Sequence, residues 1–388
     1  MLRFFASVRA FFRKGDMILL ALCCFTTLLG VLEIASATTA QDGGNTRFVI
    51  VQLAALMIGI VLYYFFSMID ISILANQRLI LTIFSTVAIG LLFFFGAEGT
   101  TGNKSWLHFS FLPFNIQPAE ICKIPFILVI AKTMSRNRDH ISSWRNIGEL
   151  AFHALYLVAL ILVFSSDAGV ALPYVFITLV VAFVGGVRGW WFVGGFALLG
   201  AGIPILWNYV MHNYQKVRFQ ILWDSSIDPY ALEERYQLSR SLDTLSGGGL
   251  TGQGLFHGAQ VQAGRLPAQH TDFIFSSIGE EMGLLGCLVV LGLLVAIIIR
   301  CFYVGSKSRS YMNRLICCGI GSMLIFQVLI NVGMCIGVVP VIGLTLPFVS
   351  YGGSSIVAMY AAMGIVSGIH LRPGEDTTIH YISKYGTK

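Results

Sequence analysis

Long apolar runs joined by short polar segments dominate this chain. A transmembrane helix needs about 20 mostly apolar residues to cross the hydrocarbon core of a bilayer. The sequence therefore predicts an all-α polytopic membrane protein with about ten transmembrane helices, folded as a single domain over residues 1–388. The predicted spans are residues 17–36, 48–69, 79–96, 118–133, 149–164, 168–186, 190–210, 274–302, 312–338 and 346–369.

One long polar segment, residues 211–273, separates the seventh and eighth predicted spans. Residues 214–218 continue the seventh span as a polar helix, and residues 235–240 predict another short helix. Residues 247–254 form a glycine-rich loop, which lacks the lysine and the preceding strand of a nucleotide-binding P-loop. We interpret it as a tight loop or as a close approach of the backbone to a ligand.

The composition agrees with a membrane location. Hydrophobic residues make up 56% of the chain and charged residues 11%, with a mean hydropathy of +0.78, whereas soluble domains carry roughly 25% charged residues. The 8 cysteines lie in or beside apolar runs and lack zinc-ligand spacing, so we expect neither disulfides nor a metal–thiolate site. The net charge of +6 gives no indication of a nucleic-acid partner.

The distribution of Lys and Arg predicts the orientation, because cytoplasmic loops of membrane proteins carry an excess of both. With the N-terminus inside, most of the 25 Lys and Arg residues fall in cytoplasmic segments, and the C-terminus is cytoplasmic as well. The N-terminus resembles a signal peptide, but its apolar run is long enough to span, so we expect an uncleaved first helix. Residues 97–117, 211–273 and 339–347 and Asp167 then face outside, which places the chemistry on the outer face.

The segment Leu266-Pro-Ala-Gln-His-Thr-Asp-Phe-Ile-Phe275 carries the strongest candidate for chemistry. It places His270 and Asp272 at the start of a long apolar run. A carboxylate near lipid is costly, so its presence indicates a functional site. Helix capping is the alternative, because an aspartate in the first turn meets the positive end of the helix dipole.

Two further groups of charged residues fall within predicted spans. Glu120 and Lys123 are three residues apart and share one face of the fourth span. They could serve function or form a buried ion pair, although such a pair is a weak stabiliser because desolvation offsets the attraction. Glu280 and Glu281 lie about two turns beyond Asp272. At least one of them needs its own partner, such as Lys123 or another inward cation, and structural support and catalysis both remain open.

Residues 331–355 are too rich in proline and glycine to form one regular span. Non-helical backbone at membrane depth is tolerated where protein covers it or where it lines a water-filled cavity. Small and hydroxyl residues also let helices approach closely. This segment is therefore a cavity wall, a packing motif, or both.

Three motifs resemble those of the SEDS family, the shape, elongation, division and sporulation membrane proteins. Gln117-Pro-Ala-Glu-Ile-Cys-Lys123 resembles Q-P-S-E-x-x-K, and residues 266–275 followed by Ile278-Gly-Glu-Glu-Met-Gly283 resemble L-P-E-x-H-T-D-F-I-F…G-E-E-x-G. Residues 343–355 are similar to the C-terminal signature of the family. Gln269 and the short tails favour the elongation (RodA) branch over the division (FtsW) branch. The chain departs from the family pattern at Ala119, Ser166 and Ala268, and the last removes a charge beside the proposed site.

The resemblance implies a peptidoglycan glycosyltransferase that polymerises lipid II, an undecaprenyl-diphosphate-linked substrate, at the outer face of the bacterial inner membrane. Asp272 matches the catalytic aspartate of the family and would act as general base, with His270 as the rival base. Lys123, Arg218 and Arg240 or Arg265 would offset the charge of the leaving diphosphate. The other substrate-binding residues expected from the resemblance are Glu120, Trp106, Gln237, Thr271, Ser350 and Ser354.

The resemblance also implies a class B penicillin-binding protein as partner, beside the membrane lipids. A divalent cation, magnesium or manganese, could share the stabilisation of the diphosphate, but no dense cluster of ligands requires one and we assign no metal-binding residue. Two other functions stay open. Broken helices and a buried Glu–Lys pair would also suit a flippase for lipid II, and a non-catalytic scaffold for the penicillin-binding protein would have no need of Asp272.

Overall fold

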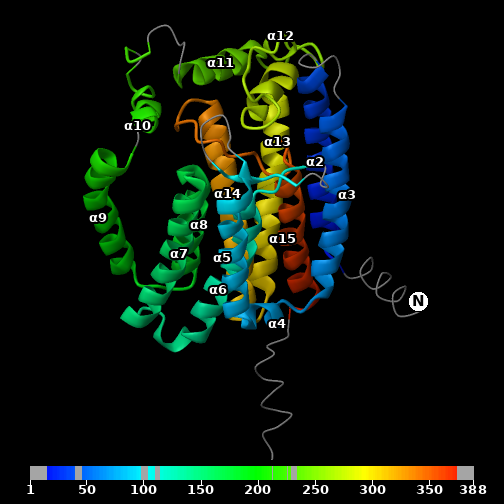
Figure 1. Ribbon diagram of the computed structural model, residues 1–388. Helices are drawn as coiled ribbons and strands as arrows, with labels where there is room; N and C mark the ends of the chain where they lie inside the picture. Colours follow the sequence, from blue (N-terminus) through cyan, green and yellow to red (C-terminus); the bar gives the residue numbers. More distant parts are fainter. Residues whose placement is uncertain are drawn as a thin grey trace, which may run out of the picture.

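The structure is a computed structural model, and it describes residues 15–39, 46–97, 104–109, 114–211, 213–224, 226–228 and 234–373. Long helices make up most of this part of the chain (Figure 1). They are α2 (Met17–Thr39), α3 (Arg47–Met68), α5 (Arg78–Phe95), α6 (Pro118–Arg136), α7 (Trp144–Ser165), α8 (Ala168–Val184), α9 (Gly189–Ile205), α13 (Ile274–Lys307), α14 (Tyr311–Cys335) and α15 (Gly353–Leu371).

Among the described residues, 8 helices are long and apolar enough to cross a membrane. The other two long helices are α8, which is apolar but has 17 residues, and α6, which carries Glu120, Lys123 and Lys132. Helices α5, α7, α8, α14 and α15 all contact α6, so Glu120 and Lys123 face protein and not lipid. The predicted all-α multi-pass membrane fold is confirmed.

Glycines let the central helices approach closely. Helix α3 packs along α15, and Gly364 lies directly against the backbone of Tyr63. A Cβ atom on Gly364 would lie 2.6 Å from the Tyr63 carbonyl oxygen, and one on Gly59 would lie 2.8 Å from the Tyr360 ring. These positions show the small-residue packing that is typical of membrane helices.

The last two predicted spans have different boundaries in the structure. Helix α14 ends at Cys335 and α15 begins only at Gly353, so residues 336–352 are non-helical. Pro340 and Pro347 cannot continue a helix, and Phe348 has a positive φ of 65°. The prediction of a span over residues 346–369 was therefore wrong at its start, while the expected non-helical backbone is present. Helix α13 runs on to Lys307, beyond the predicted end at 302.

Short elements complete the two ends of the bundle. Figure 1 shows α11 and α12 at one end, over α13 and α2, and α4 at the opposite end. Two strands pair antiparallel after α5, with Ala97 opposite Trp106. The elements are α4 (Ile71–Asn76), η1 (Arg138–His140), η2 (Leu206–Val210), α10 (Asn213–Gln220), α11 (Glu234–Gly247), α12 (Ala259–Gln262), β1 (Gly96–Ala97) and β2 (Trp106–Leu107). Both short helices predicted within the long loop have a counterpart, α10 and α11. The prediction that residues 214–218 continue the seventh span was wrong, because α9 ends at Ile205 and α10 is a separate helix that begins at Asn213.

Two buried carboxylates on α13 hold the long loop before this helix against the bundle. Glu280 accepts hydrogen bonds from the backbone N–H groups of Gln260 and Val261, at 2.8 and 2.9 Å. Glu281 accepts from the backbone N–H of Phe256 at 3.1 Å and from the Ser36 hydroxyl at 2.7 Å. Lys123, one of the candidate partners, pairs with Glu120 instead, and backbone amides of the loop bind both carboxylates. Their role here is structural, and they fix the long loop in front of α13.

Candidate active site

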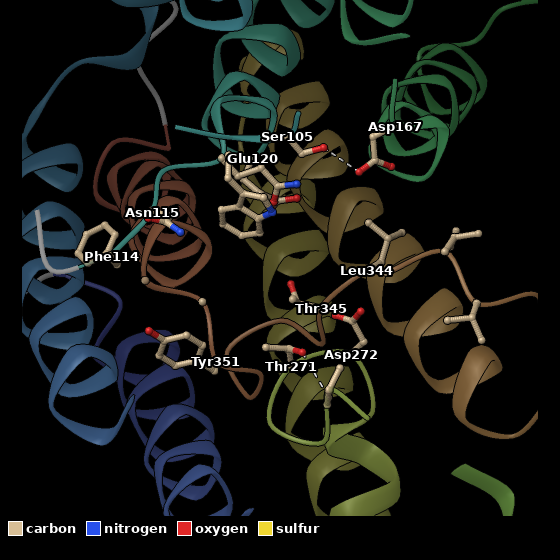
Figure 2. Close-up of a pocket in the computed structure, with 18 of the residues that line it drawn as sticks. Ser105, Phe114, Asn115, Glu120, Asp167, Thr271, Asp272, Leu344, Thr345 and Tyr351 are labelled. Carbon is tan, nitrogen blue, oxygen red and sulfur yellow. Dashed lines mark hydrogen bonds between the residues drawn. The ribbon is translucent and has the colours of Figure 1, made fainter. Parts of the chain in front are cut away.

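A cavity of about 550 Å³ opens at the end of the bundle that carries α11. Its wall is assembled from loops that are distant in sequence: the segments before α6 and α8, the end of the long loop before α13, and the non-helical segment before α15. Figure 2 shows Asp272, Thr271, Thr345 and Leu344 on one side and Ser105, Asp167 and Glu120 on another. The size suits a ligand site, since such pockets range over about 300–1,000 Å³.

Asp272 lies two residues before α13, and its half-buried side chain faces this cavity (Figure 2). The backbone that carries it is held by segments from the C-terminal third of the chain. Three consecutive carbonyl oxygens, of His270, Thr271 and Asp272, each accept a hydrogen bond. The donors are, in that order, the Tyr351 N–H at 2.9 Å, the Ser350 hydroxyl at 2.6 Å and the Asn331 side-chain amide at 2.8 Å.

Asn331 connects two segments of the cavity wall that are distant in sequence. Besides the Asp272 carbonyl, its side-chain amide donates to the carbonyl of Leu344 at 2.7 Å. Asn331 itself is fully buried in α14, so these bonds are shielded from water and count more than exposed ones. We did not predict this role. The sequence shows a polar residue in an otherwise apolar span, which is a signal, but not the carbonyls to which it binds.

The surroundings of Asp272 favour its protonated form. Burial raises the pKa of its carboxyl from 3.8 to about 6, and the Asp167 carboxyl acts in the same direction. The Thr271 hydroxyl and the Arg218 guanidinium act against this rise but do not cancel it. A carboxylate with a pKa near 6 is ionised at neutral pH and still basic enough to accept a proton from a reacting group.

Asp167 is a second carboxylate on the cavity wall, and the sequence analysis did not include it among the site residues. It caps the N-terminus of α8, where it accepts from the Val170 N–H at 3.3 Å. Its other oxygen accepts from the Ser105 hydroxyl at 3.0 Å (Figure 2). Burial raises the pKa of this carboxyl, although the bonds from Ser105 and Val170 oppose the rise. The position of Asp167 between two predicted spans, on the side predicted to face outside, was the feature of the sequence that could have indicated its place in the site.

Glu120 and Lys123 form an ion pair at the floor of the cavity, as their spacing allowed. Glu120 reaches the cavity wall, and its second oxygen accepts from the side-chain amide of Gln327 at 3.3 Å. Lys123 is fully buried beneath it. The structure therefore places Lys123 behind Glu120 and not on the surface that a diphosphate would touch, which argues against the direct contact that we expected from Lys123.

Of the other three predicted cations, Arg218 alone lines the cavity. It donates to the carbonyl of Val341 at 3.2 Å, across to the non-helical segment. Arg240 lies one turn beyond Gln237 on α11, with its guanidinium 5.2 Å from the Tyr236 ring centroid and 3.9 Å from an Asp243 oxygen. Arg265 is exposed outside the cavity wall. The long loop folds these two arginines away from the cavity, a result that residue type alone could not indicate.

Trp106, Gln237 and Thr271 line the cavity, in agreement with the sequence analysis. The remaining predicted residues do not. The His270 ring packs between Phe48 and Tyr351, with centroid distances of 4.8 and 5.7 Å, and burial lowers its pKa. Ser350 donates to the backbone as described above, and the Ser354 hydroxyl accepts from the Gln117 N–H at 3.3 Å, which ties the start of α15 to the start of α6.

A family profile described as "Cell cycle protein", covering FtsW, RodA and SpoVE, matches residues 16–373. The chain belongs to this family, the SEDS proteins. The peptidoglycan glycosyltransferase MrdB of Escherichia coli (strain K12) is 33% identical over 356 residues, which cover 91% of this chain and 92% of MrdB. The match over nearly the full length of both proteins supports the RodA-like branch.

Solved SEDS structures share the fold. A chain from a peptidoglycan synthase complex that coordinates polymerization and crosslinking superimposes with a TM-score of 0.77 at 29% identity, covering 92% of this chain and 98% of that one. The rod shape determining protein RodA of Thermus thermophilus gives a TM-score of 0.68 at 27% identity, covering 94% and 99%. Both agree with a multi-pass membrane protein.

The departure of this SEDS protein at Ala268 lies directly on the cavity wall. Ala268 has a φ of 48°, and its carbonyl accepts from the backbone N–H groups of Thr271 and Phe273, at 3.0 and 3.2 Å. The position where the SEDS motif has glutamate therefore faces the cavity that contains Asp272. Here that wall carries a methyl group instead of a carboxylate, which leaves Asp167 and Glu120 as the other acidic residues on it.

Proposed function

We propose that this SEDS protein is a peptidoglycan glycosyltransferase that polymerises lipid II into glycan strands during cell elongation. The observation that carries the proposal is a single cavity in which Asp272, with a pKa raised to about 6, shares the wall with the cationic Arg218. A glycosyl transfer from a diphosphate needs a base for the acceptor hydroxyl and positive charge for the leaving group. The name of the E. coli relative MrdB agrees with this activity.

In the proposed reaction, the Asp272 carboxylate takes the proton from the 4-hydroxyl of the acceptor sugar. The hydroxyl oxygen attacks the anomeric carbon of the donor, the bond from that carbon to the diphosphate oxygen breaks, and the diphosphate leaves with both electrons. Arg218 offsets the negative charge that grows on the leaving group. No second acid is needed to protonate it, because a diphosphate is already a good leaving group.

Purified protein and lipid II test the proposal, with glycan strands measured on gels. We expect the wild type to form strands and Asp272→Ala to form none. If Asp272→Ala retained more than a few per cent of the wild-type rate, the general-base assignment would fail. A parallel assay for transbilayer movement of lipid II in vesicles separates polymerisation from the flippase function, and normal growth of cells with Asp272→Ala would indicate a scaffold.

The proposed orientation places both termini in the cytoplasm and the cavity outside, at the outer face of the bacterial inner membrane. The positive-inside distribution of Lys and Arg supports it. On a background without the native cysteines, Ser246→Cys should react with a membrane-impermeant reagent in intact cells, and Ser142→Cys only after permeabilisation. The reverse pattern would place Asp272 in the cytoplasm, where translocated lipid II does not occur, and the proposal would fail.

A class B penicillin-binding protein is the proposed partner, since the similar chain in the peptidoglycan synthase complex belongs to an assembly that couples polymerization to crosslinking. We also propose that any magnesium or manganese ion enters with the substrate diphosphate. The described residues include no group of three His, Cys, Asp or Glu side chains that could hold a metal ion. A rate that falls in EDTA and returns with added magnesium would support the ion, and an unchanged rate would exclude it.

A further inference from the structure

Helix α13 is interrupted close to its start, at Gly283, which has a φ of 66° and a ψ of −169°. The break divides the helix into a first part, residues 274–282, and a second part, residues 284–307. Asp272 lies two residues before the first part. In a continuous helix each N–H group donates to the carbonyl four residues earlier, so a break leaves backbone groups on both sides that need other partners.

The glycine-rich loop at residues 247–254 provides these partners. Carbonyl groups of the first part accept hydrogen bonds from N–H groups of the loop, and N–H groups of the second part donate to carbonyl groups of the loop. The loop therefore stands between groups that would bind each other directly in a continuous helix. The donor and acceptor pairs are Gln253 N–H and the Glu280 carbonyl at 2.9 Å, Gly254 N–H and the Glu281 carbonyl at 2.9 Å, Leu284 N–H and the Gly249 carbonyl at 3.0 Å, and Leu285 N–H and the Leu250 carbonyl at 3.2 Å.

Side chains would not fit where the loop meets the break. A Cβ atom on Gly252 would overlap the carbonyl oxygen of Glu281. One on Gly283 would lie 2.6 Å from the carbonyl oxygen of Leu250. Both glycines also have a positive φ, of 79° and 66°, which disfavours residues that carry a side chain. The sequence left a tight loop and a close backbone approach to a ligand open, and the structure shows a close approach to α13 instead.

The two parts of α13 are held by different neighbours. In the first part, the Ser276 hydroxyl lies 2.7 Å from the Ser241 hydroxyl of α11, the helix that ends at the loop. In the second part, the Arg300 guanidinium pairs with Asp16 at 2.8 Å, and the helix packs against α14. The angle between the two parts is therefore set at the break, by the loop that joins them.

We infer that the glycine-rich loop is a positioning element for Asp272, because it fixes the angle at which the first part of α13 leaves the second. The inference rests on the proposed function, in which Asp272 is the base. Asn331, Ser350 and Tyr351 hold the backbone beside the base, and the loop holds the other end of the first part. Both ends of the short helix that follows the base are thus fixed to other segments.

A small change in this angle has a large effect at the base. With a rise of 1.5 Å per residue the first part is about 14 Å long, so a tilt of about 5° at the break moves its start by about 1 Å. A displacement of about 1 Å in a catalytic group can lower a rate about 10²-fold. None of residues 247–254 lines the cavity, so an effect of the loop on the rate passes through the position of Asp272.

Gly252→Ala tests the role of the loop, because the added methyl group overlaps the Glu281 carbonyl and forces the loop and the helix apart. Gly186→Ala is the control. Gly186 also has a positive φ, of 90°, but a Cβ atom there meets nothing within 4 Å, and it lies between α8 and α9, outside the cavity wall. With purified lipid II, we expect Gly252→Ala to lower kcat at least tenfold and to change KM less than twofold, and Gly186→Ala to change neither by more than twofold. Assays below the unfolding temperature of each variant exclude loss of folded protein as the cause.

Glu281→Gln is a milder second variant for the case in which Gly252→Ala does not fold. It keeps the shape of the side chain but removes the charge that accepts from the Phe256 N–H, so it loosens the loop without any overlap. It should lower kcat at least threefold at an unchanged KM. An equal loss of kcat in Gly186→Ala, or full activity of both Gly252→Ala and Glu281→Gln, would overturn the inference.

The distance between two spin labels measures the angle without turnover. On a background without the native cysteines, Asp243→Cys on α11 and Ser306→Cys near the end of the second part carry the labels, because both positions are exposed. We expect one narrow distance distribution in the parent and in Gly186→Ala, and a shifted or clearly broadened one in Gly252→Ala. An unchanged distribution would overturn the inference even if kcat falls. A wild type that forms no glycan would contradict the proposed function, whereas the distances would still test the loop.

Discussion

Replacing Asp272 by asparagine should make the protein more stable at neutral pH while it removes activity. The pKa of this carboxyl rises from an ordinary 3.8 to about 6 in the folded protein, chiefly through burial. Below pH 4 the group is protonated in both the folded and the unfolded chain and contributes nothing. Between about pH 4 and pH 6 the unfolded chain releases this proton while the folded protein still holds it, so stability falls; above pH 6 the loss is complete, because the folded protein holds a charged carboxylate that the unfolded chain keeps in water. The stability lost over this window is the linkage between folding and ionisation.

The size of the effect follows from the two pKa values. Each pKa unit corresponds to about 1.4 kcal/mol, so a rise from 3.8 to about 6 costs at most about 3 kcal/mol. The cavity gives the side chain some contact with water, which makes this an upper value. Asparagine has nearly the same shape and no charge, so Asp272→Asn should recover most of it above pH 6.

Thermal unfolding in detergent measures the prediction, at one scan rate because membrane proteins rarely unfold reversibly. The apparent Tm of Asp272→Asn should exceed that of the wild type at pH 7.5, and the difference should disappear between pH 6 and pH 4. Asp243→Asn is the control for the loss of one carboxylate, because Asp243 is 60% exposed on α11. A wild type as stable as Asp272→Asn at pH 7.5 would refute the argument that burial sets this pKa.

Three further predictions follow from the same contacts. The polymerisation rate should fall about tenfold per pH unit below about pH 6, because the Asp272 base becomes protonated. Asp167→Asn removes a like charge and should shift this acidic fall of the rate–pH profile to lower pH, and a profile that does not shift would contradict the prediction. Lys123→Met should lower the free energy of unfolding by about 3–5 kcal/mol, because Glu120 loses its buried partner. Adding Glu120→Gln should restore most of this loss, and strict additivity in the double-mutant cycle would contradict the prediction. Asn331→Leu should lower the free energy of unfolding by roughly 1–3 kcal/mol for each carbonyl that it leaves without a donor. It should also lower kcat more than it raises KM, and a pure KM effect in steady-state kinetics would argue that Asn331 does not position the base.

The membrane fold could be predicted because hydropathy is a local property of the chain. Each of the long helices coincides with a predicted span, and the errors lie at helix ends, such as the start of α15 at Gly353 and the end of α13 at Lys307. The multi-residue motifs pointed to Asp272 and to Glu120, and the side chains of both line the same cavity. Local composition was sufficient for the fold, whereas the site also required the resemblance to the family motifs.

Long-range contacts could not be predicted, and they account for the corrections. The sequence does not indicate the hydrogen-bond donors of Glu280 and Glu281, because these include backbone amides of a loop some 20 residues earlier in the chain. Arg240 and Arg265 have the right charge for a diphosphate, but the folding of the long loop turns them away from the cavity. The type of a residue shows which chemistry its side chain can perform, and only the packing shows where that side chain lies.

Ser350 shows why a motif rich in hydroxyl groups is ambiguous between binding and support. Residues 336–352 are non-helical, so their backbone groups need partners that a helix would have provided. Ser350 meets this need on both sides: its oxygen accepts from the Leu346 N–H at 2.8 Å, and its hydroxyl donates to the Thr271 carbonyl at 2.6 Å. Together with Asn331 it fixes the backbone beside a carboxylate whose charged form destabilises the fold. The C-terminal motif therefore acts on the proposed chemistry through the position of Asp272, and substitutions there should change the rate without any contact to substrate.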